Sequence, residues 1–366
     1  MTFTALDEDR GAQFPRNPLR GKGRRRKRRG DPHATVPEAE FTSYYGRNIV
    51  KPAPWEHEIA DYLFLGGLAA GSALIGAGAS ITGRAKLRRR SRISSLVAIG
   101  LGGNALIADL GRPERFLNMM RTAKLTSPMS VGSWILTGFS VTTGAATGLA
   151  ILRDPDPRME LVRQKLHLHQ AVAPWLKWAD GLATAGSAFF SPPLAAYTAV
   201  LLADTATPLW HESYRELPFI FVSSATAAGS GLAMITSPVE ETGPVRQLAV
   251  IAAACDLGAD RLLEERLGEE GTPLHEGAGG RFHTAAKALT VAGLVGSAVA
   301  RHNKALNIAS GLCLLGGSFC TRYAFWHAGV QSAEDPIYTV RPQRRRAEAK
   351  RAAGKGVDQP GGEWPA

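Results

Sequence analysis

Long apolar runs separated by short charged connectors dominate the middle of the chain. A helix needs roughly 20 mostly apolar residues to cross a hydrocarbon core that is about 30 Å thick. The runs that predict such helices are 59–82, 93–110, 130–152, 175–209, 217–237, 245–263, 288–300 with its flanks, and 305–325. The pattern therefore predicts an all-α integral membrane protein, a bundle of about eight transmembrane helices.

Two of these runs are irregular. The run 175–209 is too long for one straight helix and carries Pro192 and Pro193 at its middle, which predicts one broken or kinked helix whose free backbone groups are satisfied by neighbouring helices. The run 245–263 is the weakest, because Asp256, Asp260 and Arg261 interrupt it. The expected number of crossings depends on this run.

The two ends of the chain differ from its middle. Residues 1–51 and 331–366 are polar and basic, so we expect disordered tails around a transmembrane domain at 52–330. The formal net charge of the chain is +11. An Arg-rich run at 22–29 is either a solvated tail or a contact with the anionic lipid of the bilayer, and we expect no nucleic acid as a partner.

Glycines recur in the apolar runs at the spacing that lets helices approach closely in lipid. The first run contains Gly66, Gly67, Gly71, Gly76 and Gly78, and the third contains Gly144 and Gly148. We expect both sets to serve helix packing.

Ionisable residues gather on one side of the predicted bundle. If the runs alternate in direction, the side on which the first run starts receives His57, Asp61, Asp109, Arg112, His211, Glu212, Asp256, Asp260, Arg322 and His327, with the aromatic Trp210 beside them. Ionisable groups inside a membrane are costly and usually face the bundle interior or a cavity, so they indicate a functional site. The alternative is that they mark the membrane interface, where charge is tolerated.

Two groups on this side suggest proton chemistry and a charge pair. His57 and Asp61 are spaced i, i+4 and share a helix face, which suits a proton-exchanging pair. Asp109 lies near a helix C-terminus, where the helix dipole disfavours an anion. Arg112, in the turn before Pro113, is the expected compensating charge.

The sequence argues against a redox cofactor bound by this chain. Cys255, Cys313 and Cys320 form no CxxC motif, whereas an iron–sulfur cluster needs four thiolates in characteristic spacing. A CxxCH motif for covalent haem is missing. The histidines fall at the ends of apolar runs or in connectors, so no pair is placed to hold a b-type haem. We expect no haem and no iron–sulfur cluster.

Three motifs carry a family resemblance. They are YLFLGGLAAG at 62–71, DLGRPERF at 109–116 followed by SPMSVGSW at 127–134, and YTAVLL at 197–202 running into PLW at 208–210 and LPF at 217–219. In this order, over about residues 52–330, the chain resembles the NrfD/polysulfide reductase membrane-subunit family.

The resemblance implies a quinone-reactive membrane subunit of a respiratory oxidoreductase that is not catalytic alone. The family docks to a ferredoxin-like iron–sulfur subunit, which in turn binds a molybdopterin-containing catalytic subunit. Its substrate is menaquinone or ubiquinone, and its place is the bacterial cell membrane. Carried over to this sequence, the pocket residues are His57, Asp61 and Tyr197, with Asp109 and Arg112 adjoining. The sequence departs from the family pattern at Ala199, where a glycine often follows the threonine.

Other functions fit parts of the pattern. A secondary transporter or proton-translocating channel would show an inverted internal repeat, and the two halves show no convincing correspondence. A pure anchor would bind the iron–sulfur subunit without touching quinone. Proton pumping through Lys177, Asp180 and Asp204 is a further alternative. Lys and Arg are slightly more numerous in the connectors on the side opposite the N-terminus, where six of them fall between Arg84 and Arg92, than in the connectors on the N-terminal side. This bias favours termini outside the cytoplasm.

Overall fold

The fold is described by a computed structural model that covers residues 48–110, 113–121, 123–152 and 173–353. Helices and turns make up these ranges, and they contain no strand. The Arg-rich run at 22–29 and Arg112 lie outside the described residues. The described part therefore confirms the all-α prediction.

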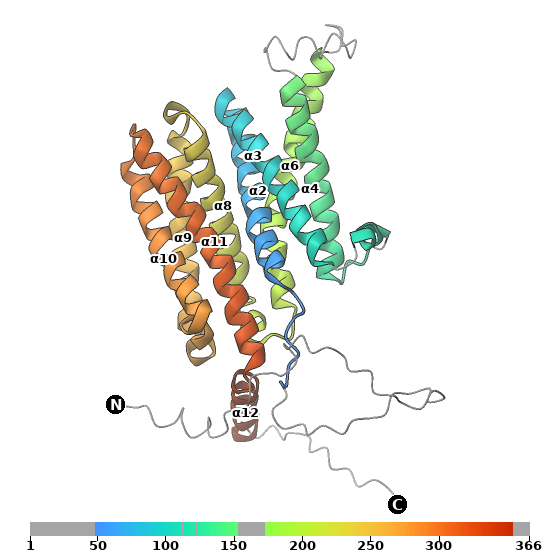
Figure 1. Cartoon of the computed structure of the whole chain (residues 1–366), viewed down its shortest axis with the longest axis vertical. Helices are drawn as coiled ribbons and strands as arrows, with labels where there is room; N and C mark the ends of the chain where they lie inside the picture. Colours follow the sequence, from blue (N-terminus) through green and yellow to red (C-terminus); the bar gives the residue numbers. More distant parts are fainter. Residues whose placement is uncertain (1–47, 111–112, 122, 153–172, 354–366) are drawn as a thin grey trace, which may run out of the picture.

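Long helices lie side by side and form the body of the molecule (Figure 1). They are α2 (His57–Ile81), α3 (Ala85–Asp109), α4 (Pro128–Leu152), α6 (Ala173–Ala203), α8 (Leu217–Thr236), α9 (Gly243–Leu267), α10 (Gly277–Val299) and α11 (Lys304–Glu334). Short helices between and after them are η2 (Pro113–Arg121), α7 (Pro208–Glu212), η4 (Val239–Glu241), η5 (Gly268–Leu274) and α12 (Ile337–Ala352). Helix α2 is central, because it packs against α3, α6, α8 and α11.

Six helices of the described part are long and apolar enough to cross a membrane. They are α2, α3, α4, α6 from Pro174 onward, α8 and α10. Helices α9 and α11 are of similar length and pack in the same bundle, but their sequences do not reach that apolarity. The chain is thus a multi-pass α-helical membrane protein, and crossing by α9 and α11, which would make eight, stays a prediction.

The proline-containing run forms one continuous helix. Helix α6 passes through Pro192 and Pro193 without interruption and ends at Ala203. The run is therefore not broken at the prolines, and a kink there stays a prediction. Within this stretch the Ser191 hydroxyl donates to the carbonyl of Ser187 at 2.7 Å. The chain then turns into the separate short helix α7, which explains why the apolar run extended to residue 209.

The basic segment before the second apolar run belongs to helix α3. Arg92 was expected in a connector, but it is buried in α3 and its Nη1 lies 2.6 Å from Oδ1 of Asp180 in α6. Its Nη2 also donates to the Thr184 hydroxyl at 2.5 Å. Because Arg92 is paired inside the bundle, it does not contribute to the charge bias used to predict orientation. Asp180, an alternative proton-pumping residue, is a partner in this structural ion pair.

The C-terminal segment is helical for much of its length. Residues 331–366 were predicted to form a disordered tail, yet α11 continues to Glu334 and α12 covers Ile337–Ala352. Helix α12 lies beyond the end of α11, on the side of the bundle where α2 begins (Figure 1). Ion pairs attach it to the bundle: Arg345 to Glu269 and Arg346 to Glu212. The prediction of disorder is wrong for this part because these acidic partners come from distant segments.

Glu270, which follows the ion-paired Glu269, is expected to make the stability of the folded chain depend on pH. Partial burial and the nearby Glu212 raise the pKa of Glu270, and Arg346 and Arg345 oppose that shift only in part. A raised pKa means that the folded chain binds the proton more tightly, so the associated stability is present at low pH and is lost as the pH rises through that pKa. We expect Glu270→Gln to raise the unfolding temperature at pH 7.

This gain should vanish below pH 4.5, the ordinary value of a glutamate, where wild type and variant are both uncharged at this position. Thermal unfolding of the purified chain at several pH values measures it. Glu269→Gln is the matched control, since Glu269 is ion-paired with Arg345 and should give no gain. A gain from Glu270→Gln that persists at acidic pH would contradict the assignment.

Candidate functional site

Two tyrosines meet between α2 and α6. The hydroxyls of Tyr62 and Tyr197 form a short hydrogen bond, and the Tyr62 side chain is buried. The Tyr197 ring lies against Gly132 of α4, where an added Cβ would overlap the ring. Gly132 belongs to the SPMSVGSW motif, so this motif leaves space for the tyrosine. The predicted residue Tyr197 therefore lies in a site built by three helices.

Asp61 faces a different helix from its neighbour Tyr62. The hydroxyl of Tyr323 in α11 donates to Asp61 Oδ1 at 2.7 Å. Tyr323 is surrounded by rings: Phe282, Phe319, Trp326 and His327 all have ring centroids within 6.4 Å of its own. Successive residues of α2 thus anchor two hydroxyl contacts, one toward α6 and one toward α11.

His57 does not join Asp61 in the expected pair. Its side chain is 63% exposed, and its Nδ1 lies 3.4 Å from Oε2 of Glu58. Asp61 makes its hydrogen bond to Tyr323. The spacing of His57 and Asp61 correctly places both in the first turns of α2, but the partner of Asp61 comes from α11.

Asp109 is compensated by a helix start. Its Oδ1 accepts the backbone N–H of Glu56 at 3.3 Å, at the residue that precedes α2. The N-terminus of a helix carries a partial positive charge that stabilises an anion, which offsets the unfavourable position of Asp109 at the end of α3. Arg112, the expected partner, lies outside the described residues. Asp109 therefore links the end of α3 to the start of α2.

A buried arginine lies close to these contacts. Arg322 is 1% exposed, and its Nη2 donates to the carbonyl of Phe221 at 2.8 Å while its guanidinium covers the Phe221 ring at 3.8 Å. Its Nε donates to the carbonyl of Leu63 at 3.4 Å. Arg322 of α11 thus contacts both α8 and α2, and its contact on α2 is Leu63, the residue that follows Tyr62. Arg322 was expected on this side of the bundle, and the structure buries it in the bundle interior.

Sequence reasoning missed several polar residues of this region. Tyr62 and Tyr323 carry the partner hydroxyls, and His283 is buried within α10. The expectation that histidines fall at helix ends or in connectors is wrong for His283 and for His327, which lies inside α11. Tyr62 is the first residue of the YLFLGGLAAG motif, and this was the signal available for it. Tyr323 and His283 lie outside all three motifs and gave no signal.

Comparison with known protein families shows to which family the chain belongs. The family model described as "Polysulphide reductase, NrfD" matches residues 47–243. This is more than half of the 366-residue chain. The chain belongs to the NrfD family. The search of curated proteins found no match.

The NrfD match contains the tyrosine pair and all three sequence motifs. It ends at Gly243, the first residue of α9, whereas the resemblance was expected to reach residue 330. Tyr323 and His283 therefore lie beyond the matched part. The chain is a membrane subunit of the NrfD family, which typically associates with oxidoreductase subunits, and this is consistent with the membrane anchor of a respiratory oxidoreductase.

Proposed function

We propose that this NrfD-family subunit reacts with membrane quinone and exchanges electrons with a ferredoxin-like iron–sulfur subunit. That partner in turn binds a molybdopterin-containing catalytic subunit, as in formate dehydrogenase-like or polysulfide reductase-like complexes of the bacterial cell membrane. The observation that supports the proposal best is the hydrogen-bonded pair of hydroxyls of buried Tyr62 and partly buried Tyr197, which lies inside the part of the chain that matches the family.

The chemistry of quinones explains why such a pair matters. Reduction of a quinone takes two electrons and two protons, so the site needs hydrogen-bond donors to the carbonyls and a route for protons. Tyr197 donates to one carbonyl when its hydroxyl turns from Tyr62 to the substrate. Asp61 and Tyr323 form a second donor–acceptor pair that starts from the adjacent residue of α2. His57, exposed at the start of α2, exchanges protons with water.

The electrons must come from outside the chain. The sequence lacks the cysteine spacing for an iron–sulfur cluster, so in this proposal the partner supplies the redox centre and menaquinone or ubiquinone is the substrate. Asp109 sits at the same end of the bundle as the start of α2, where its bond to Glu56 shapes the surface on which that partner docks.

Photolabelling of the assembled complex in membranes tests the proposal. A photoreactive quinone should label peptides that contain Tyr62 or Tyr197, and excess unlabelled menaquinone or ubiquinone should suppress that labelling. The peptide around Arg92 is the internal control, because Arg92 lies near the start of α3, whereas Asp109 at the end of α3 is bonded to the residue before α2. Equal labelling of the Arg92 peptide, or labelling that neither quinone suppresses, would refute a specific quinone site and favour a pure anchor.

A further inference from the structure

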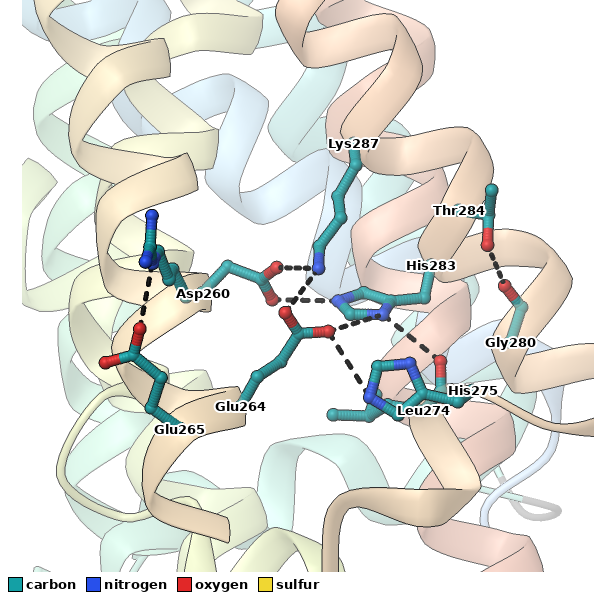
Figure 2. A network of polar contacts seen from close by, with 10 residues as sticks. Asp260, Glu264, Glu265, Leu274, His275, Gly280, His283, Thr284 and Lys287 are labelled. Atoms are coloured by element: carbon teal, nitrogen blue, oxygen red, sulfur yellow. Dashed lines mark hydrogen bonds and ion pairs between the residues drawn. The ribbon is translucent and has the colours of Figure 1, made fainter. Parts of the chain in front are cut away.

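Three metal-binding side chains converge at the end of the bundle formed by α9, η5 and α10 (Figure 2). Glu264 comes from the last turns of α9, His275 follows η5, and His283 lies in α10. One donor atom from each falls within 4.8 Å of the other two. Oε1 of Glu264 lies 3.4 Å from Nε2 of His275 and 3.8 Å from Nδ1 of His283.

These spacings are close to those of a zinc coordination sphere. Zinc binds imidazole nitrogen and carboxylate oxygen at about 2.0–2.2 Å, so ligand atoms in a tetrahedral site are about 3.3–3.5 Å apart. Oε1 of Glu264 is buried and has no hydrogen-bond partner among the described residues. A buried unpaired carboxylate oxygen is costly, and a cation at this position would satisfy it.

The side chains behind the cluster orient it for metal binding. Nε2 of His283 lies 2.8 Å from Oδ1 of Asp260, the arrangement in which a metal-binding histidine donates its other ring N–H to a carboxylate. Nζ of Lys287 donates to Oε2 of Glu264 at 2.6 Å and forms an ion pair with Oδ2 of Asp260 at 3.1 Å. Lys287 thus neutralises Oε2 of Glu264 and leaves Oε1 of Glu264 facing the histidines. Two carboxylates against one ammonium leave a net negative charge for a cation.

The backbone between η5 and α10 places the exposed ligand. Gly277 has a positive φ of 60°, which permits the sharp turn into α10. Gly280 lies so close to the backbone of His275 that no Cβ would fit there. The carbonyl of Leu274 lies 3.1 Å from Nδ1 of His283 and is a candidate fourth ligand, with water as the alternative. The half-exposed His275 closes the site from the outside.

We propose that Glu264, His275 and His283 bind a divalent metal ion of the zinc class. The ion would join α9 to α10 at this end of the bundle, outside the part of the chain that matches the NrfD family. The proposal does not depend on quinone chemistry.

The chain contains a natural comparison cluster. Glu56, His57 and Glu58 also bring three donor atoms within 4.8 Å, but His57 is 63% exposed and bonds no second carboxylate within the described part of the chain. This second cluster has three donor atoms but no counterpart of Asp260 and Lys287 behind them among the described residues, so we expect it to bind metal weakly. His57→Gln is therefore the matched control for His275→Gln.

Zinc titration of the purified full-length chain tests the proposal. For this titration the chain is prepared without a polyhistidine tag and is stripped of metal with EDTA. His167 and His169 are replaced by Gln in this parent chain, because two histidines so close in sequence could bind metal themselves. Calorimetry should find a tight site that His57→Gln leaves unchanged. Asp260→Asn should weaken it by roughly 10- to 100-fold, the usual effect of losing an outer-shell partner, and His275→Gln or Glu264→Gln by more.

Two further measurements separate binding from folding. His275→Gln changes a half-exposed side chain, so it should fold even if the buried His283→Gln does not. Zinc should raise the unfolding temperature of the parent chain and not that of His275→Gln, and cobalt should give the absorption of a tetrahedral site only in the parent. Absence of tight binding, equal weakening by His57→Gln, or zinc affinity unaffected by His275→Gln would each overturn the proposal.

Discussion

Tyr197→Phe is expected to lower quinone-dependent turnover of the assembled complex by roughly 10²-fold, the lower end of the contribution of a positioned proton donor. The change removes one oxygen and keeps the ring that packs on Gly132. Activity with an artificial dye that accepts electrons before the quinone site should stay unchanged. Tyr214→Phe is the matched control, since Tyr214 is 50% exposed and bonds only Arg215 among the described residues.

A stability measurement distinguishes a chemical role from a structural one. Tyr197→Phe leaves the hydroxyl of buried Tyr62 without its partner, which costs about 1–3 kcal/mol, whereas removing both partners of a hydrogen bond is nearly neutral. The double variant Tyr62→Phe with Tyr197→Phe should therefore unfold like wild type and still turn over quinone slowly. Recovery of quinone turnover in the double variant would show that the pair is only structural.

Asp61→Asn extends the same test to α11. The carboxylate accepts from Tyr323, and the amide oxygen of asparagine can also accept, although more weakly, so the contact between α2 and α11 should persist. Proton exchange requires the acid and should be lost. Equal loss of dye and quinone activity would assign Asp61 to assembly of the complex.

The apolar runs predicted the helices well because the length of a crossing is a local property. The prediction failed where a charged residue is paired with a residue that is distant in the sequence. The segment before residue 93 resembled a connector, yet Arg92 lies inside α3 because Asp180, 88 residues later, pairs with it. The helix α12 was missed for the same reason, since Glu269 and Glu212 hold its arginines.

The site was predicted in part. Tyr197 was identified from the family resemblance, and Asp61 from its spacing with His57 as well as from that resemblance. Their hydrogen-bond partners lie 135 and 262 residues away, respectively. Helical periodicity states which residues share a face and does not state what that face contacts. This is why the sequence paired Asp61 with His57, one turn away, and the structure pairs it with Tyr323. The proposed metal-binding triad, Glu264 of α9, His275 after η5 and His283 of α10, left no local motif for the same reason.

The glycine pattern was predicted as one class, and the structure divides it. Gly71 lies where α2 crosses α8, and a Cβ there would overlap the carbonyl oxygen of Ala225; a Cβ on Gly229 would lie 2.6 Å from the carbonyl carbon of Gly71. In contrast, Gly78, Gly144 and Gly148 have nothing within 4 Å of an added Cβ. The expectation of helix packing is wrong for these three within the described residues.

Gly71→Ala is therefore expected to destabilise the bundle by about 3 kcal/mol, the upper end of the usual cost of overpacking, because the clashing group is backbone and cannot rotate away. Gly78→Ala in the same helix should be neutral or stabilising by about 0.5–1 kcal/mol, since alanine favours a helix over glycine. Unfolding of both variants in mixed detergent measures the difference. Adding Ala225→Gly should not rescue Gly71→Ala, because it removes a side chain and leaves the obstructing carbonyl in place. Full rescue by Ala225→Gly, or equal effects at positions 71 and 78, would show that the two helices do not cross at Gly71.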